Sequence, residues 1–292
     1  MKFKGTALMA AVFLSLVLYY FFVDLPALQK ENSEKELADK ILPLDAKKVV
    51  EFSLTRNGKP ITLRRTGPNN WGLTQPLSSP GDSTEAEAFI SEIEALKKTR
   101  VVEENPKDLS IYGLGSPFMK IHFNIENKTS ETLLIGDESP MGGGLYFKRE
   151  SQPAVMMALA SQSQFQKSVY NFRDKTLLSF STGNIKRIKI NREAHPLELV
   201  KKDDVWKVSG ALGAKGDKDA IMKFLQSIQF SKIQEFVDEN PDSLELYGLH
   251  PPKLKLILEN EKGETQTLAL GNPKEDKGYY GKVNDSPTIL LT

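Results

Sequence analysis

The sequence predicts an α+β protein with an N-terminal transmembrane helix followed by two tandem homologous units. Each unit is expected to be a mainly antiparallel sheet with one amphipathic helix and one short capped helix. Three observations predict this fold. A motif near residue 110 returns 135 residues later, as Pro106 and Pro241 show (241 − 106). Polar and apolar residues alternate along several segments, which is typical of strands buried on one face. One segment in each copy has apolar residues at helical spacing.

The repeat is clearest in NPKDLSIYGLGSP at 105–117 and NPDSLELYGLHPP at 240–252. The same spacing relates Trp71 to Trp206, the only two tryptophans in the chain. A fixed spacing over this length indicates two copies of one folding unit. Residues present in both copies most simply serve the fold, so a special site is expected in one copy only.

Composition sets limits on the class of protein. The chain has 292 residues, of which 39% are hydrophobic and 26% charged, as in ordinary globular domains. The net charge of +1 gives no electrostatic argument for a nucleic-acid partner. The sequence has no cysteine, which excludes disulfides, thiol nucleophiles and cysteine-ligated metals.

Residues 6–23 carry no charge and are long enough to cross a membrane, at about 27 Å of helix. Lys2 and Lys4 precede this span and Asp24 follows it. The positive-inside rule therefore predicts that residues 1–5 are cytoplasmic and that the rest is extracytoplasmic, as in a single-pass protein of the cytoplasmic membrane. A cleaved signal peptide and a buried helix are the alternatives. Bulky aromatics before Asp24, rather than small residues, favour an uncleaved anchor.

Residues 24–47 are polar and rich in helix formers, and we expect a stalk there. The first repeat unit is predicted at 48–157. Alternation from Val50 to Thr55 indicates a strand, and Asn57-Gly58 indicates a hairpin turn.

An amphipathic helix is expected after Trp71, with Asp82 or Ser83 as its N-cap, and its counterpart follows Asp217. Further strands after the motif end at Gly136 and Gly271. Residues 158–179 are interpreted as a connecting helix and loop.

The second repeat unit is predicted at 180–292, with a hairpin turn near Ala194–Pro196. Its last apolar strand matches the stretch around 154–157, so residues 158–176 have no expected counterpart after Thr292.

The motif itself is typical of a short capped helix. Asparagine suits the N-cap, and proline suits the first helical position because its missing N–H costs nothing there. Glycine can adopt the left-handed conformation that ends a helix. The residues given these structural roles are Asn105, Pro106, Tyr112, Gly113, Pro117, Asn240, Pro241, Tyr247, Gly248 and Pro252. A binding surface of paired acidic residues and tyrosines is the alternative.

Together, the strand pair, Trp71 before Pro76, the amphipathic helix and the NPxxLxxYGLxxP motif resemble a known family. It is a bacterial family of unknown function, found as tandem copies behind one membrane helix and encoded beside ABC exporters of the gliding-motility type. The resemblance covers about residues 44–292. It implies an extracytoplasmic partner of a transporter complex and supplies no catalytic residues. The second copy departs from the pattern where KVSGALG follows Trp206.

No catalytic, cofactor-binding or metal site is predicted. His122, His195 and His250 form no metal-binding pair. Ser116 is followed by proline and so does not fit a nucleophile elbow. The glycines at 141–144 lack a phosphate-loop signature and favour a wide hairpin turn.

Two further features could contact a partner. Trp71 and Trp206 could stack on sugar rings, although a core position is the more common one for such tryptophans. The basic segment at 186–192 could also meet a partner, but its charges are expected mostly to face water.

The sequence therefore favours a non-enzymatic, membrane-anchored accessory or scaffold subunit of an ABC-type export complex. Its expected partners are the transporter permease and associated envelope proteins. A glycan- or lipid-binding module acting between the repeats is an alternative. A cell-envelope hydrolase is a second alternative, for which the sequence offers no signature.

Overall fold

The computed structural model describes residues 3–192, 195–210 and 214–292. The chain divides into two compact units, Met1–Arg173 and Asp174–Thr292. Both are built on antiparallel sheets with few helices, which confirms the predicted α+β class. Ala194, in the turn predicted in the second unit, and Lys2, ahead of the predicted anchor, lie outside the described residues.

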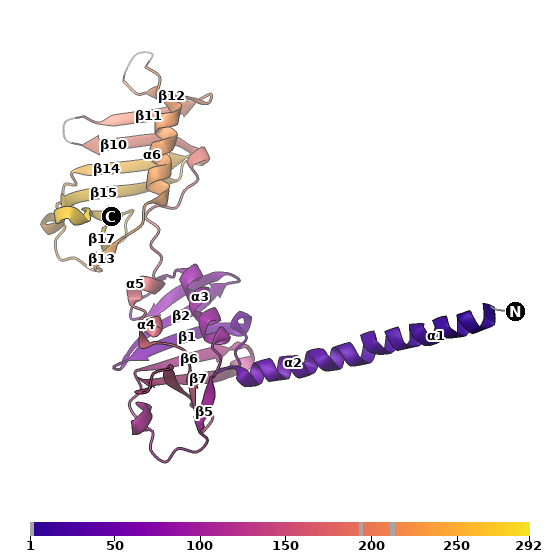
Figure 1. Ribbon diagram of the computed structural model, residues 1–292. Helices are drawn as coiled ribbons and strands as arrows, with labels where there is room; N and C mark the ends of the chain where they lie inside the picture. The colour runs from indigo at the N-terminus through magenta and orange to yellow at the C-terminus, as the bar shows by residue number, and fades with distance from the viewer. Residues whose placement is uncertain (1–2, 193–194, 211–213) are drawn as a thin grey trace. The chain divides into compact units, whose positions relative to one another are not determined.

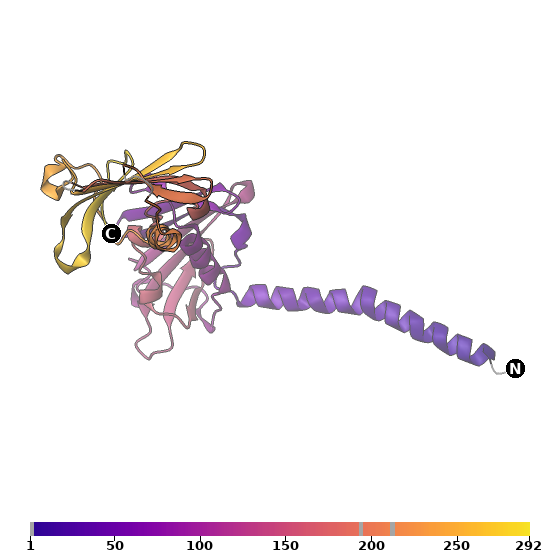
Figure 2. The ribbon, with the colours of Figure 1, turned by 90° about the horizontal axis from the view of Figure 1, so that it is seen from above.

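One long helix leads into the first unit (Figures 1 and 2). It consists of α1 (Phe3–Tyr19), a π-helical turn (Tyr20–Asp24) and α2 (Leu25–Asp39). Among the described residues, one helix (Val12–Asp39) is long and apolar enough to cross a membrane, and none of its apolar window is buried. The predicted span therefore continues into the stalk region as one helix.

The first sheet has the strand order β4-β3-β2-β1-β6-β7-β8-β9-β5, with antiparallel neighbours throughout. Its strands are β1 (Val49–Arg56), β2 (Lys59–Gly67), β3 (Asn70–Gln75), β4 (Ser79–Pro80), β5 (Arg100–Glu103), β6 (Met119–Ile125), β7 (Thr129–Glu138), β8 (Leu145–Arg149) and β9 (Val155–Ala158). Asn57 and Gly58 join β1 to β2 with positive φ, as the hairpin prediction requires. The glycines at 142–144 also have positive φ, in the predicted turn between β7 and β8.

Helix α3 (Ser83–Ala95) lies across one face of this sheet (Figure 1). The Asp82 side chain caps it by accepting a hydrogen bond from the Glu85 amide at 3.1 Å. Its apolar side packs with the sheet into the main core of the unit, where Phe52, Phe89 and Phe123 are almost fully buried. The remaining helical segments are the 3-10 turns Ala46–Lys48, Ser110–Tyr112 and Glu126–Lys128, and the short helices α4 (Gln162–Phe165) and α5 (Val169–Phe172).

The second sheet has the order β12-β11-β10-β14-β15-β16-β17-β13, which repeats the order of the first from β3 to β5. A single antiparallel bridge between Lys207 and Lys215 stands where the first sheet pairs β3 with β4. Its strands are β10 (Ile185–Arg192), β11 (Leu197–Lys202), β12 (Val205–Val208), β13 (Glu235–Asp238), β14 (Leu254–Asn260), β15 (Thr265–Pro273), β16 (Tyr279–Val283) and β17 (Ile289–Leu291). The remaining helical segments are α6 (Lys218–Phe230) and the 3-10 turns Thr182–Asn184, Glu245–Tyr247 and Glu275–Lys277. Helix α6, capped by Asp217, lies on one side of the sheet and is seen nearly end-on in Figure 2.

Two segments predicted as connections belong to the cores instead. Ile41, Leu42 and Leu44, placed in the stalk by the sequence, are buried in the core of the first unit. Phe165 and Phe172, placed in the connecting segment, are buried in the same core. Scattered apolar residues without a regular period gave no sign of this burial, because it depends on contacts distant in the sequence.

Candidate functional site

The C-terminal end of the long helix is fixed to the first unit by backbone hydrogen bonds. The Lys98 amide donates to the Asp39 carbonyl at 2.8 Å, and the Ile41 amide donates to the Leu96 carbonyl at 2.8 Å. Two ion pairs lie beside them, Lys40 with Glu94 at 3.6 Å and Lys97 with Glu36 at 3.8 Å. The helix therefore meets the folded unit without a flexible linker.

Arg149 on β8 completes this junction. Its Nε donates to the Ile41 carbonyl at 2.6 Å, and its Nη2 donates to the Lys40 carbonyl at 3.1 Å. These carbonyls lie just beyond the end of α2, where carbonyl groups lack intrahelical donors. Partial burial lowers the pKa of the Arg149 guanidinium, although an arginine at this position stays charged. Arg149 was not predicted from the sequence, where it is one of two adjacent basic residues, Lys148 and Arg149, that follow the apolar residues 145–147.

The repeated motif forms a single 3-10 turn in each unit, Ser110–Tyr112 and Glu245–Tyr247. The prediction that Asn105 and Asn240 cap a helix is wrong, because the turn begins several residues later. Pro106 and Pro241 correspondingly do not open a helix. Asp108 and Ser243 accept from the first turn amides instead, at 2.8 and 3.2 Å.

Glycines explain much of the repeat. Gly113 and Gly248 end the turns in the left-handed conformation, with φ of 66° and 67°, as expected. A Cβ on Gly136 would lie 2.1 Å from the Tyr112 carbonyl oxygen, and a Cβ on Gly271 would lie 2.1 Å from the Tyr247 carbonyl oxygen. The turn and the strand thus touch at a point that admits no side chain.

The motif tyrosines are held in the same way in both units. The Tyr112 hydroxyl donates to Glu103 at 2.7 Å, and the Tyr247 hydroxyl donates to Asp238 at 2.9 Å. The hydrogen bonds to these carboxylates raise the pKa of both phenols, because they stabilise the protonated hydroxyl, and desolvation and the neighbouring negative charge act in the same direction. Each ring also makes an edge contact, Tyr112 with Tyr146 and Tyr247 with Tyr280. Pro117 and Pro252 lie in the segments leading to β6 and β14.

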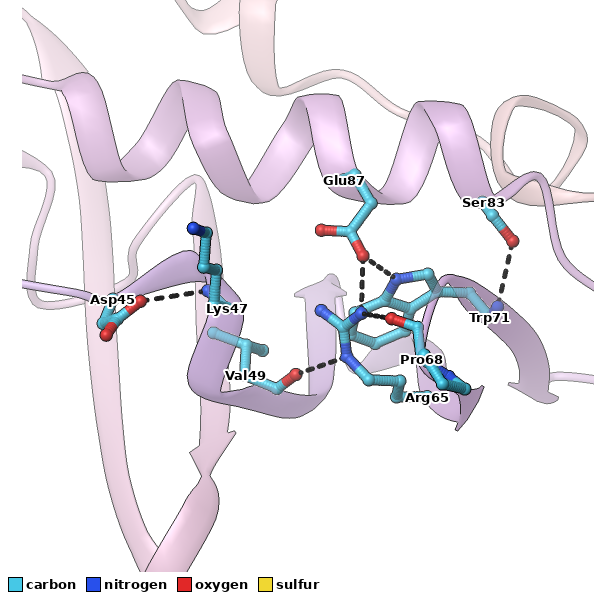
Figure 3. Close-up of polar contacts among 8 residues, drawn as sticks. All are labelled: Asp45, Lys47, Val49, Arg65, Pro68, Trp71, Ser83 and Glu87. Carbon is cyan, nitrogen blue, oxygen red and sulfur yellow. Dashed lines mark hydrogen bonds and ion pairs between the residues drawn. The ribbon is translucent and has the colours of Figure 1, made fainter.

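Both tryptophans are buried, with 3% of each residue exposed. Their ring faces are therefore not free for stacking on a ligand, which corrects the suggested interaction role of Trp71 and Trp206. In the first unit the Trp71 indole N–H donates to Glu87 on α3 at 2.8 Å (Figure 3). Arg65 donates to the same Glu87 oxygen at 2.7 Å and lies 4.6 Å from the indole ring centre.

The contacts among Arg65, Trp71 and Glu87 are not repeated by the matching residues of the second unit. Lys201 on β11 pairs with Trp206 as Arg65 pairs with Trp71 on the matching strand, and it forms an ion pair with Asp204 at 3.0 Å. The α6 position that matches Glu87 is Met222, which has no carboxylate. At this point the first unit therefore ties its helix to the sheet by charge, and Met222 offers no carboxylate for the same contact in the second unit.

A second unit-specific feature is a polar chain on the sheet face of the first unit. Thr132 bonds to His122 Nδ1 at 2.9 Å, and His122 Nε2 bonds to the Asn124 side-chain oxygen at 3.1 Å. Asn124 donates to Glu51 at 2.8 Å, and Arg64 donates to the other Glu51 oxygen at 2.7 Å. These residues, except Thr132, line a shallow cavity of about 360 Å³. The register of β2, β1, β6 and β7 brings these residues together, and the sequence alone did not predict the chain.

In the second unit the corresponding strand positions carry ion pairs. Arg187 contacts Glu198 at 2.7 Å and Glu259 at 3.2 Å, and Lys189 contacts Glu198 at 3.5 Å. Arg187 Nε is buried without hydrogen-bond geometry toward any partner, so this network is only partly satisfied. The position of His122 is occupied by Ile257, because each lies opposite the matching residue of β1 or β10.

His195, His250 and Ser116 are exposed in turns or loops. Within the described ranges, no group of three or more histidine, aspartate or glutamate residues is placed to hold a metal ion. What the described residues do provide is a helix of membrane-spanning length, its fixed junction, and two sheet faces of different chemistry.

A comparison with protein-family models finds one match, Domain of unknown function (DUF4340), over residues 71–211 and again over 206–292. The matches begin at Trp71 and Trp206, which are related by the repeat found in the sequence, and the first match continues past Arg173 into the second unit. Neither the comparison with curated proteins nor the comparison with solved structures found a match.

Proposed function

Since the chain belongs to the family Domain of unknown function (DUF4340), which names no activity, we propose a function from the geometry of the anchor. The protein is a non-enzymatic, membrane-anchored accessory or scaffold subunit of an ABC-type export complex. Its two units lie on the outer side of the membrane and contact the permease or associated envelope proteins.

The observation that carries this proposal is the junction of the long helix with the first unit. An exposed apolar helix has to be covered by lipid or by other helices, because leaving it in water forgoes its hydrophobic stabilisation. Arg149 and the backbone bonds to Asp39 and Ile41 fix the orientation of the first unit on that helix. A scaffold needs such a fixed orientation, whereas a tethered enzyme acting on diffusible substrates does not.

The transporter partner comes from the family resemblance, and it is directly testable. Residues 1–25 are replaced by a cleavable secretion signal, and the permease recovered with the protein from detergent-solubilised membranes is measured by mass spectrometry. We expect recovery to be lost, because tethering raises the local concentration at the permease. Full recovery of the permease with the untethered form would overturn the proposal.

The junction is tested separately from the tether. A ten-residue glycine-serine segment inserted between Asp39 and Lys40 keeps the anchor but frees the first unit. The same segment inserted at Gly263, where a hairpin turn leaves open space, is the matched control. We expect the first insertion to reduce permease recovery and the second to leave it unchanged.

The non-enzymatic part of the proposal is tested by replacing His122, His195 and His250 together with alanine. Circular dichroism checks that the variant folds. We expect export by the complex to continue, because His195 and His250 are exposed in loops or turns and the His122 ring nitrogens are bonded to Thr132 and Asn124. Loss of export in a folded variant would instead favour an enzyme.

A further inference from the structure

Ile111 and Leu246 occupy the same position of the repeated motif, and both are exposed, to 66% and 75%. Single exposed aliphatic residues are common on protein surfaces. These two differ because the position is aliphatic in both copies while the fold leaves it in water. The preceding position, also exposed, is polar in both copies, as Ser110 and Glu245.

Packing of the turn does not require an aliphatic residue at this position. In a 3-10 helix, side chains three apart lie on one side. Leu109 and Tyr112 have that spacing, and both belong to the small core formed against β7, β8 and β9. Ile111 lies between them in sequence and outside that core. A polar residue would serve the fold at this position equally well.

The turn presents this side chain in a fixed conformation. Asp108 and Ser243 hold the start of the two turns through hydrogen bonds to the backbone. Gly113 and Gly248 fix the end in the left-handed conformation. A pre-organised side chain loses little conformational entropy when it binds, which is a property of good docking residues.

Charge around the two residues narrows the choice of partner. Residues 103–112 contain three carboxylates and one lysine, and residues 238–247 contain four carboxylates and no basic residue. The Ser110 hydroxyl lowers the pKa of Asp108, which keeps it ionised. Acidic surroundings oppose contact with an anionic lipid surface and favour a basic protein surface.

We infer that Ile111 and Leu246 are equivalent docking residues, each of which inserts into an apolar pocket with a basic rim on a protein partner. The inference rests on the proposed function, because it names the surface by which the scaffold holds that partner. Two equivalent docking residues on one chain also raise the effective concentration of the second contact once the first has formed.

Photo-crosslinking in intact cells tests the contact directly. A photoreactive amino acid is placed in the full-length chain at position 111, 246, 159 or 230. Leu159 and Phe230 are the controls, because each is 74% exposed but lies outside the repeated motif. We expect adducts to one protein from positions 111 and 246 only, at apolar sites flanked by lysine or arginine. Adducts to lipid, to a second copy of this chain, or equally from all four positions would overturn the inference.

Substitution then measures the contribution of the two side chains. Ile111→Ser and Leu246→Ser together should weaken co-purification of the cross-linked protein about tenfold, as expected for docking residues. Leu159→Ser with Phe230→Ser should leave co-purification unchanged. Unaltered binding in the first variant, with loss on removal of residues 1–25, would reject the docking role and retain the scaffold. Adducts to a protein outside a transporter complex would support the docking role and reject the proposed function.

Discussion

Beneath α3 the core of the first unit is aromatic, whereas the matching core of the second unit is mainly aliphatic. The Phe52 ring lies 5.7 Å from Phe89, 6.3 Å from Phe123 and 5.7 Å from Phe172. In the second unit, Ile188 takes the strand position of Phe52, and Leu258 takes that of Phe123.

The opposite sheet faces differ as well. The first unit has a chain of hydrogen bonds that begins at the uncharged Thr132 and ends at the charged Arg64. The second unit has a network of ion pairs around Arg187. Strand order, register and the glycine contact under the motif are nevertheless the same. The comparison shows that strand pairing tolerates exchange of whole sets of side chains, provided that polar and apolar positions keep alternating.

The largest expected difference between the units lies in their cores. Phe52→Ala should lower the free energy of unfolding by about 4 kcal/mol, and Ile188→Ala by about 3 kcal/mol, because each leaves a cavity. Calorimetry of the full-length protein in detergent should show each change in a separate transition. Phe230→Ala at an exposed position is the control, with an effect below about 0.5 kcal/mol. A single shared transition would mean that the units do not unfold independently.

A smaller and equal effect is expected where the units agree. Gly136→Ala and Gly271→Ala place a Cβ against a tyrosine carbonyl and should each cost about 1–3 kcal/mol through overpacking. Urea unfolding followed by circular dichroism measures both. Gly183→Ala, which meets open space without a positive φ, should change little. If only one of the two buried glycines proves sensitive, the shared contact is not a common requirement of the fold.

The tyrosines predict a loss of stability at alkaline pH. Glu103 raises the pKa of Tyr112 in the folded protein above its ordinary value of 10.0. The contribution of Tyr112 to the free energy of unfolding is therefore fully present below pH 10.0. The contribution is lost as pH rises through the higher folded pKa. Tyr112→Phe should therefore flatten the fall in unfolding free energy above about pH 10. Tyr247→Phe should act likewise in the second unit.

The smallest change in stability is expected in acid, for the ion pairs on the sheet of the second unit. Arg187, through its hydrogen bond, lowers the pKa of Glu198 below the ordinary value of 4.5. The contribution of this pair to the free energy of unfolding is present above the pKa that Glu198 has in the unfolded chain. It is lost as pH falls through the lower pKa that Glu198 has in the folded protein. Glu198→Gln should remove this acid dependence, with a change of less than about 1 kcal/mol for a partly exposed pair. The matching position in the first unit is Thr62, which does not titrate.

Much of this fold follows from local patterns. Alternation predicted the strands around Phe52. The sequence narrowed the first cap to Asp82 or Ser83 and placed the counterpart helix from Asp217 onward, and Asp82 and Asp217 are the observed caps. The left-handed glycines of the motif were predicted from their position after an apolar turn. Each of these features depends on neighbours within a few residues.

The failures depend on contacts across the sequence. Asn105 and Pro106 have the composition of a helix start, but packing of Leu109 and Tyr112 places the turn later. The chain from His122 to Glu51 requires strands 73 residues apart to lie in register. The docking of Arg149 on the Ile41 carbonyl spans 108 residues. No local period contains that information.

The helical stalk also sets a length. Helix α2 runs from Leu25 to Asp39, or about 22 Å at the rise of an α-helix. Because Ile41 is already in the core of the first unit, no flexible segment follows α2. The length of α2 therefore fixes the distance from the apolar span to the first unit. Inserting or deleting one residue in α2 would turn the first unit by about 100° around the helix axis. Adding seven residues would nearly restore its direction and raise it by about 10 Å.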